Sequence, residues 1–174
     1  AAFEIIDALG RAPDYHFLPV GNAGNISAYW MGYNEYCDAG IVSKRPVMVG
    51  CQASGAAPFL RGHTVHQPET IATAIRIGCP QSWGLANQAQ EESLGWFRES
   101  LDEDILMAQK ILAEREGIFC EPASAVCIAG LIAELERQTI PSGATIVCTL
   151  TGHGLKDPDT AVSQSRQPIK VSPD

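Results

Sequence analysis

The chain has 174 residues, of which 45% are hydrophobic and 18% charged, a composition typical of a folded globular domain and not of a disordered one. Its formal net charge is -8 at pH 7, and it has no basic stripe to neutralise phosphates, so neither nucleic acid nor an anionic membrane surface is expected as a partner. It contains no apolar run long enough to span a bilayer and no secretory leader at its start, which predicts a cytoplasmic protein.

The first half of the chain alternates between helical and extended patterns. The expected order is a helix ended by Gly10, a strand at 15–20, a helix at 25–37, a short strand at 46–49 and a loop at 52–58. This alternation predicts an α/β domain with a mainly parallel, open sheet flanked by helices. Because the chain does not begin with Met and opens within a helix, we expect it to be a piece of a longer protein.

The second half is dominated by helical patterns. Helices are expected at 68–77, 82–99, 102–116 and 122–137, with Asp102 as an N-cap and a short extended run at 117–120. The clearest buried strand is expected at 144–150, and the chain from Pro158 onward is polar. Residues 1–159 are therefore interpreted as part of one domain, and 160–174 as a polar tail.

The segment Pro19–Ile26, which reads PVGNAGNI, joins an extended run to a helical one. Gly21 and Gly24 let the backbone approach a ligand closely, so that successive N–H groups can converge on an anion. The N-terminus of the following helix adds a partial positive charge at the same place. The segment is a candidate phosphate site, although Gly and Asn would also form a plain strand-to-helix turn.

Three loops are expected at one edge of the sheet, each after the carboxyl end of an extended run. They are 21–25, 121–124 and 151–154. Open parallel sheets bind ligands at this edge, which favours one shared cofactor site. Two of these loops also have a simpler interpretation. Glu121-Pro122 could be no more than the start of a helix, and 151–154 could be a flexible turn.

Four segments in this order resemble the threonine synthase family: 20–30 (VGNAGNISAYW), 69–78 (ETIATAIRIG), 121–125 (EPASA) and 150–158 (LTGHGLKDP). The resemblance covers roughly residues 1–159. It implies a pyridoxal 5′-phosphate (PLP) enzyme of fold type II, similar to the tryptophan synthase β subunit, of which this chain would form part of the large domain. The implied reaction of the intact protein is the lyase conversion of O-phospho-L-homoserine and water into L-threonine and phosphate, in amino-acid biosynthesis.

The resemblance also implies roles for single residues. Gly21, Asn22, Ala23, Gly24 and Asn25 would bind the cofactor phosphate, and Asn22 would also bind the substrate phosphate. The hydroxyl of Thr151 would meet the pyridine nitrogen of the cofactor. A neutral hydroxyl there, unlike a carboxylate, does not favour a protonated ring nitrogen, so the cofactor would withdraw electrons only moderately.

The family's Schiff-base lysine lies in a Ser-Phe-Lys-Asp segment, and no such segment occurs in this chain, whose lysines are Lys44, Lys110, Lys156 and Lys170. The resemblance therefore implies a carboxyl-terminal fragment that contains no catalytic residue and is inactive alone. Its partners would be the missing N-terminal half and, in the intact protein, a second copy in a homodimer. The alternatives are a threonine or serine dehydratase-like PLP lyase and a non-catalytic phosphate-binding domain.

Other kinds of site have weaker support. His63 and His66 lie in a loop-like segment without a nearby cysteine or carboxylate cluster, so no metal site is expected. His153 between two glycines is more typical of a residue that shapes the backbone than of a general base. No G-x-S-x-G motif is present, which argues against a Ser-His-Asp hydrolase.

Overall fold

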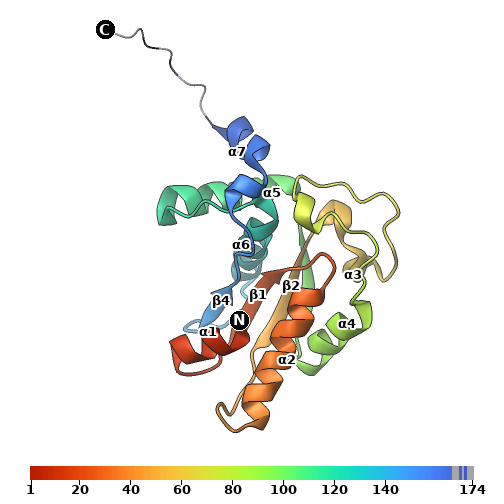
Figure 1. The fold of residues 1–174 in the computed structure, drawn as a ribbon, viewed down its shortest axis with the longest axis vertical. Coiled ribbons are helices and arrows are strands. Elements are labelled where there is room, and N and C mark those ends of the chain that lie inside the picture. The colour runs from red at the N-terminus through yellow and green to blue at the C-terminus, as the bar shows by residue number, and fades with distance from the viewer. Residues whose placement is uncertain (166–168, 170, 172–174) are drawn as a thin grey trace.

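The computed structural model describes residues 1–165, 169 and 171, and they contain a parallel sheet in the order β3-β2-β1-β4 (Figure 1). The strands are β1 (Tyr15–Pro19), β2 (Val47–Ala53), β3 (Trp96–Ser100) and β4 (Ile146–Cys148). In register, Phe17 of β1 lies opposite Val49 of β2 and Cys148 of β4. The predicted α/β class with an open parallel sheet is confirmed.

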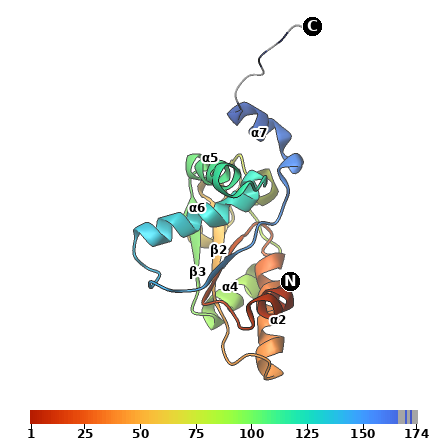
Figure 2. The ribbon, with the colours of Figure 1, turned by 90° about the vertical axis from the view of Figure 1, so that its left-hand side faces the viewer.

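Helices cover both faces of the sheet (Figure 2). One face carries α1 (Ala2–Leu9), α2 (Gly24–Asp38) and α4 (Trp83–Glu92), and the other carries α5 (Asp102–Ile111) and α6 (Pro122–Glu136). The shorter elements are α3 (Pro58–Arg61), α7 (Pro158–Gln164), 3₁₀ turns at Ser54–Ala56, Thr73–Ile75 and Gly154–Lys156, and a π turn at Leu112–Glu116. No helix in the described part of the chain is both long and apolar enough to cross a membrane.

The two cores follow from the alternation of side chains along the strands. Phe17 and Val49 point toward α5 and α6, whereas Leu18 and Met48 point toward α1, α2 and α4, and all four side chains are fully buried. The central strands β1 and β2 bury mainly apolar side chains on both faces, as expected for parallel strands covered on both sides, and His16 and Gln52 are the buried polar residues in them. The sheet is thus a rigid base for the loops at its carboxyl edge.

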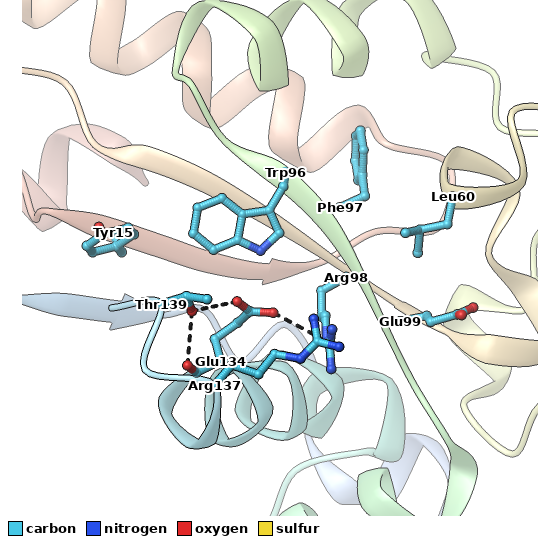
Figure 3. Close-up of a pocket in the computed structure, with 9 residues that line it drawn as sticks. All are labelled: Tyr15, Leu60, Trp96, Phe97, Arg98, Glu99, Glu134, Arg137 and Thr139. Atoms are coloured by element: carbon cyan, nitrogen blue, oxygen red, sulfur yellow. Dashed lines mark hydrogen bonds and ion pairs between the residues drawn. The ribbon is translucent and has the colours of Figure 1, made fainter. Parts of the chain in front are cut away.

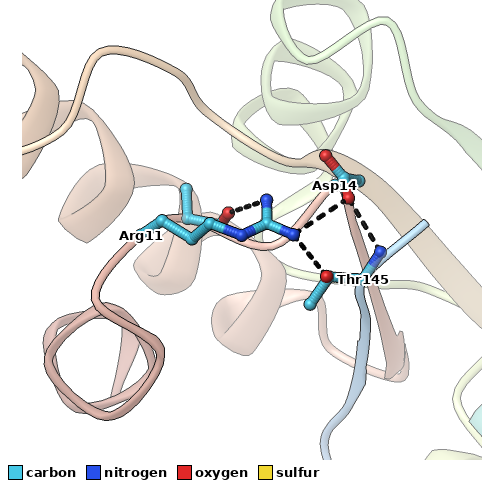
Figure 4. A network of polar contacts seen from close by, with 4 residues as sticks. Arg11, Asp14 and Thr145 are labelled. Atoms are coloured by element: carbon cyan, nitrogen blue, oxygen red, sulfur yellow. Dashed lines mark hydrogen bonds and ion pairs between the residues drawn. The ribbon is translucent and has the colours of Figure 1, made fainter. Parts of the chain in front are cut away.

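A polar network holds β1 and β4 together at their amino ends (Figure 4). The backbone N–H of Thr145 donates to Asp14 Oδ2 at 2.7 Å, and the Asp14 N–H donates to the carbonyl of Thr145 at 2.8 Å. Arg11 contacts both the Asp14 carboxylate and the Thr145 hydroxyl. The Thr145 N–H, followed by the Arg11 guanidinium, lowers the pKa of Asp14. This network lies opposite the carboxyl edge, where the candidate loops are.

Four expected helices or strands differ in the structure. Residues 68–77 are irregular apart from one 3₁₀ turn, and the helix expected at 82–99 ends at Glu92, after which β3 begins at Trp96. The strand expected at 144–150 is limited to β4 and is half-buried, because it lies at an edge of the sheet. The second strand is longer than expected and extends to Ala53.

Two further details are corrected. The N-cap of α5 is Leu101 rather than Asp102, whose carboxylate instead accepts hydrogen bonds from Thr70 Oγ1 at 2.5 Å and from the Ile71 N–H at 3.0 Å. The run 117–120 is not a strand, since it contributes only an isolated antiparallel bridge between Cys120 and His153. The segment 121–124 therefore does not follow a strand of the sheet.

Candidate functional site

The loop 21–25, here called the phosphate loop, connects the end of β1 to the start of α2. The N–H of Val20 still pairs with the carbonyl of Cys51, so the loop leaves the sheet only after that residue. Ala23 then adopts a left-handed conformation, with φ 66° and ψ 8°, and acts as the N-cap of α2. A left-handed residue reverses the direction of the chain and turns its amides toward one side, which is the geometry of an anion-binding nest.

The backbone N–H groups of the phosphate loop find no hydrogen-bond acceptor in the described part of the chain. Within residues 1–165, 169 and 171, none of the five N–H groups from Gly21 to Asn25 donates to a backbone or side-chain acceptor. Buried or half-buried N–H groups are nearly always paired, so unpaired amides at a helix N-terminus favour an anion as their partner. The phosphate loop therefore has the donor groups that a phosphate requires.

The two asparagines of the loop have different roles. Asn25 is used internally, because its Nδ2 donates to the carbonyl of Pro19 at 2.6 Å and its Oδ1 accepts the Ile26 N–H at 2.7 Å. Asn22 is exposed, and its Oδ1 and carbonyl accept the N–H groups of Gln81 and Ser82 at 3.4 and 3.2 Å. The Nδ2 of Asn22 makes no hydrogen bond to the described residues, which leaves two donors at the rim of the loop.

The segment 69–78 packs against the phosphate loop. A Cβ on Gly21 would lie 3.1 Å from the Cα of Ile75, so only glycine allows this approach without displacement. The same segment is tied to the chain after β4, since Thr73 Oγ1 donates to Asp157 Oδ2 at 3.4 Å. Segments far apart in the sequence thus form one continuous structure at this edge of the sheet.

Thr151 and the first turn of α6 meet beside β4. Ser124 is fully buried, and its Oγ accepts the Gly152 N–H at 2.7 Å and lies 3.1 Å from Oγ1 of the exposed Thr151. The Glu121 N–H donates to the carbonyl of Gly152 at 3.0 Å. The expected meeting of 121–124 with 151–154 is therefore present, through hydrogen bonds. The hydroxyl of Ser124 was not among the predicted site residues.

Comparison with known proteins now decides the family. Residues 1–152 match the family model described as pyridoxal-phosphate dependent enzyme. The chain belongs to this family.

Two curated relatives illustrate its position within the family. Over 99% of its length the chain is 56% identical to a threonine synthase of Mycobacterium bovis, and over 98% it is 54% identical to one of Synechocystis. It covers 49% and 44% of those two proteins, so it spans about half the length of the curated relatives that it matches. The resemblance expected from the four segments is confirmed.

A solved structure supports the fold. The processed form of threonine deaminase isoform 2 from Solanum lycopersicum superimposes with a TM-score of 0.76 at 20% identity, over 93% of this chain and 46% of that one. The expected PLP fold of type II, similar to the tryptophan synthase β subunit, is confirmed. At this level of identity the likeness concerns the fold alone.

Two other chemically active side chains near the site are His153, which is already hydrogen-bonded, and Cys120, whose thiol stays protonated. In this member of the family, His153 Nδ1 accepts the Leu155 N–H at 3.2 Å and so caps the following turn. Burial raises the pKa of the Cys120 thiol to about 11, which keeps it protonated at neutral pH.

The lysines Lys44, Lys110 and Lys156 are exposed, and Lys170 lies outside the described residues. Within the described residues no cluster of three or more metal-ligating side chains occurs.

A cavity lies elsewhere on the molecule. It has a volume of about 460 Å³ and is bordered by Trp96, Arg98 and Glu134 (Figure 3). The cavity lies along the edge strand β3, from Trp96 to Glu99, beside the end of α6, and the phosphate loop does not line it. Because open parallel sheets bind ligands at their carboxyl edge, the phosphate loop remains the better candidate.

Proposed function

We propose that the protein to which this chain belongs is a threonine synthase that uses PLP to convert O-phospho-L-homoserine and water into L-threonine and phosphate. The main support is the identity of 56% to a threonine synthase across 99% of this chain. The unpaired N–H groups of the phosphate loop support the binding of a phosphate-bearing cofactor. Cofactor binding, substrate and activity are all part of this proposal.

The phosphate loop would hold the cofactor by its phosphate. The N–H groups of Ala23, Gly24 and Asn25 lie at the N-terminus of α2, so backbone dipoles would neutralise the charge of the phosphate without a lysine or arginine. Gly21 and Asn22 complete the loop, and the free Nδ2 of Asn22 would donate to the phosphate of the substrate. That contact would hold the leaving group in place during the elimination.

Thr151 would hold the opposite end of the cofactor. When bound, PLP supplies an electron sink for the negative charge that develops on the substrate. The neutral hydroxyl of Thr151 would donate to the pyridine nitrogen, without the charge of a carboxylate that would favour protonation of the ring. The ring would then have the moderate electron withdrawal that an elimination and hydration sequence needs.

The lysine that binds the cofactor covalently would lie outside this chain. Among the described lysines, only Lys156 falls in a family-like segment, and it is exposed on the turn Gly154–Lys156. We infer that the other half of the protein supplies the lysine, that the intact protein is a cytoplasmic homodimer, and that this chain is inactive alone. The division into a domain part at 1–159 and a tail at 160–174 is also part of the proposal.

Substrate turnover by the full-length protein tests the proposal against its alternatives. We expect release of phosphate and formation of threonine from O-phospho-L-homoserine, with PLP present. Turnover of serine or threonine alone would instead indicate a dehydratase-like lyase. A full-length protein that binds phosphate but has no lysine available to PLP would indicate a non-catalytic domain.

A charge change in the phosphate loop gives a more local test. A side chain at Gly24 has space, since a Cβ there would meet only Ser82 Oγ, at 4.0 Å. Gly24→Asp places a carboxylate beside the cofactor phosphate, and Gly24→Asn has the same shape without the charge. We expect Gly24→Asp to bind PLP at least about tenfold more weakly than Gly24→Asn in an absorbance titration of the full-length protein. Equal affinities would contradict the assigned phosphate position.

A further inference from the structure

The first turn of α6 holds the segment that carries Thr151 from two sides. The Gly152 N–H donates to Ser124 Oγ at 2.7 Å, and the Gly152 carbonyl accepts the Glu121 N–H at 3.0 Å. Gly152 also has no Cβ, and a Cβ there would lie 1.9 Å from Glu121 Oε1. Both backbone polar groups of Gly152 are thus hydrogen-bonded, and a Cβ at this position would displace the Glu121 carboxylate.

The hydroxyl of Ser124 has one proton, and the geometry indicates where it goes. Besides accepting from Gly152, Ser124 Oγ lies 3.1 Å from Thr151 Oγ1 and 3.3 Å from the Gly152 carbonyl. That carbonyl already accepts the Glu121 N–H, whereas Thr151 Oγ1 is closer and has no other partner among the described residues. The arrangement therefore favours donation from Ser124 to Thr151.

This donation would determine the direction of the next hydrogen bond. If Thr151 accepts from Ser124, its own proton is left to point outward, away from the buried serine. A hydroxyl that accepts a hydrogen bond is also a stronger donor, because successive hydrogen bonds polarise one another. Ser124 is fully buried and Thr151 is exposed, so Ser124 acts on a ligand through its hydrogen bonds to the segment that carries Thr151 and not by direct contact.

We propose that Ser124 is a positioning residue that orients the Thr151 hydroxyl as a hydrogen-bond donor toward the pyridine nitrogen of the cofactor. This inference rests on the proposed function, because it needs PLP in the site. A neutral ring nitrogen can only accept a hydrogen bond, so it needs a donor. Ser124 would ensure that the Thr151 hydroxyl is that donor. Without Ser124, the Thr151 hydroxyl could rotate and present its lone pairs instead.

A double-mutant cycle in the full-length protein tests the inference. Ser124→Ala is expected to weaken PLP binding about five- to tenfold in an absorbance titration, as for the loss of one hydrogen bond. In a Thr151→Val background, the same change is expected to alter the affinity less than twofold, because the hydroxyl through which Ser124 acts is gone. Ser124→Cys, which keeps a similar shape with a weak donor, should resemble Ser124→Ala, and it serves for the cycle if the alanine variant does not fold.

The matched control is Ser93→Ala, which removes another buried serine hydroxyl. Ser93 Oγ accepts the Met48 N–H and donates to Gln90, on the opposite side of the sheet from Thr151, so PLP affinity should not change. The inference is overturned if Ser124→Ala leaves the affinity unchanged, or if it weakens binding equally in the Thr151→Val background. Failure of the unmutated protein to bind PLP would overturn the proposed function itself.

Discussion

Gly78→Ala is expected to lower the free energy of unfolding by about 3 kcal/mol or more. A Cβ on Gly78 would lie 1.8 Å from the backbone oxygen of Val65, a contact that no rotamer change can relieve. The two backbones are also paired, since the Val65 N–H donates to the Gly78 carbonyl at 2.9 Å. Urea unfolding of the variant and the unmutated protein measures the difference.

The consequence of Gly78→Ala should extend to the phosphate loop. The residues after Gly78 lead to Gln81 and Ser82, whose N–H groups hold Asn22, so displacement of this segment releases the rim of the loop. Gly84→Ala is the control, because a Cβ at that helical position meets nothing within 4 Å. It should change stability by less than about 1 kcal/mol, toward greater stability. Similar stabilities for the two variants would contradict the close approach at Gly78.

The strand β3 shows why part of the fold could not be predicted from local patterns. The segment Trp96–Ser100 continues a polar, helix-like sequence, and as an edge strand it alternates without a clear buried face. The break before it depends on Leu94, which adopts a positive φ of 55°, and on Gly95, where a Cβ would lie 1.9 Å from the Met48 carbonyl. The close approach at Gly95 is a tertiary contact, whereas Leu94 is exposed and ends α4 through the local hydrogen bond from the Gly95 N–H to the Gln90 carbonyl. Leucine gives no sign of a left-handed turn.

The segment 68–77 was wrongly predicted as a helix for a related reason. Its backbone and side chains are bonded to distant partners, as when the Asp102 carboxylate accepts the Thr70 hydroxyl and the Ile71 N–H. The same contact explains why Asp102 does not cap α5. Asp and Thr side chains can form hydrogen bonds that replace those of a helix. Which of the two sets forms depends on the tertiary structure, which the local sequence does not specify.

The turn from β1 into α2 was predicted correctly because its signals lie in adjacent residues, whereas its role as a phosphate site stays a prediction. Small side chains and the start of a helix can be recognised from neighbouring residues, but the left-handed conformation falls on Ala23 and on neither Gly21 nor Gly24, which the sequence did not indicate. Ser124 was missed because a serine in the first turn of a helix is ordinary, and its contact with Thr151 joins residues 27 positions apart. The glycine after Thr151, Gly152, was the available signal. A glycine there indicates that another segment packs closely against the backbone, but the sequence does not tell which segment this is.

The stability of the protein is expected to fall by about 3 kcal/mol between pH 6.5 and pH 4 because of His16 alone. This side chain on β1 is fully buried, and burial lowers its pKa from 6.5 to about 4. Its Nε2 lies 2.7 Å from Thr149 Oγ1 and its Nδ1 lies 3.1 Å from the Tyr33 hydroxyl. The ring of Tyr29 packs edge-on against it, and none of these neighbours carries a negative charge that would stabilise an imidazolium.

The sign follows from proton linkage. Below pH 6.5 the unfolded chain binds a proton at His16 while the folded protein does not, so acid favours unfolding, and the contribution is fully present only above pH 6.5. The pKa of Asp14 is lowered by the Thr145 N–H and that of Glu92 by the Trp30 indole, and both contributions are also lost in acid. Their ordinary values are 3.8 and 4.5, so their loss begins at lower pH than that of His16.

His16→Gln separates the histidine from these carboxylates. Glutamine keeps a donor and an acceptor but does not titrate, so the free energy of unfolding should be nearly constant between pH 6.5 and 4.5, whatever its value at neutral pH. His66→Gln removes an exposed histidine instead and should retain the full pH dependence. If His16→Gln loses stability over this range as steeply as the unmutated protein, then the folded protein already accommodates a charged His16, and the network with Thr149 and Tyr33 must open to water.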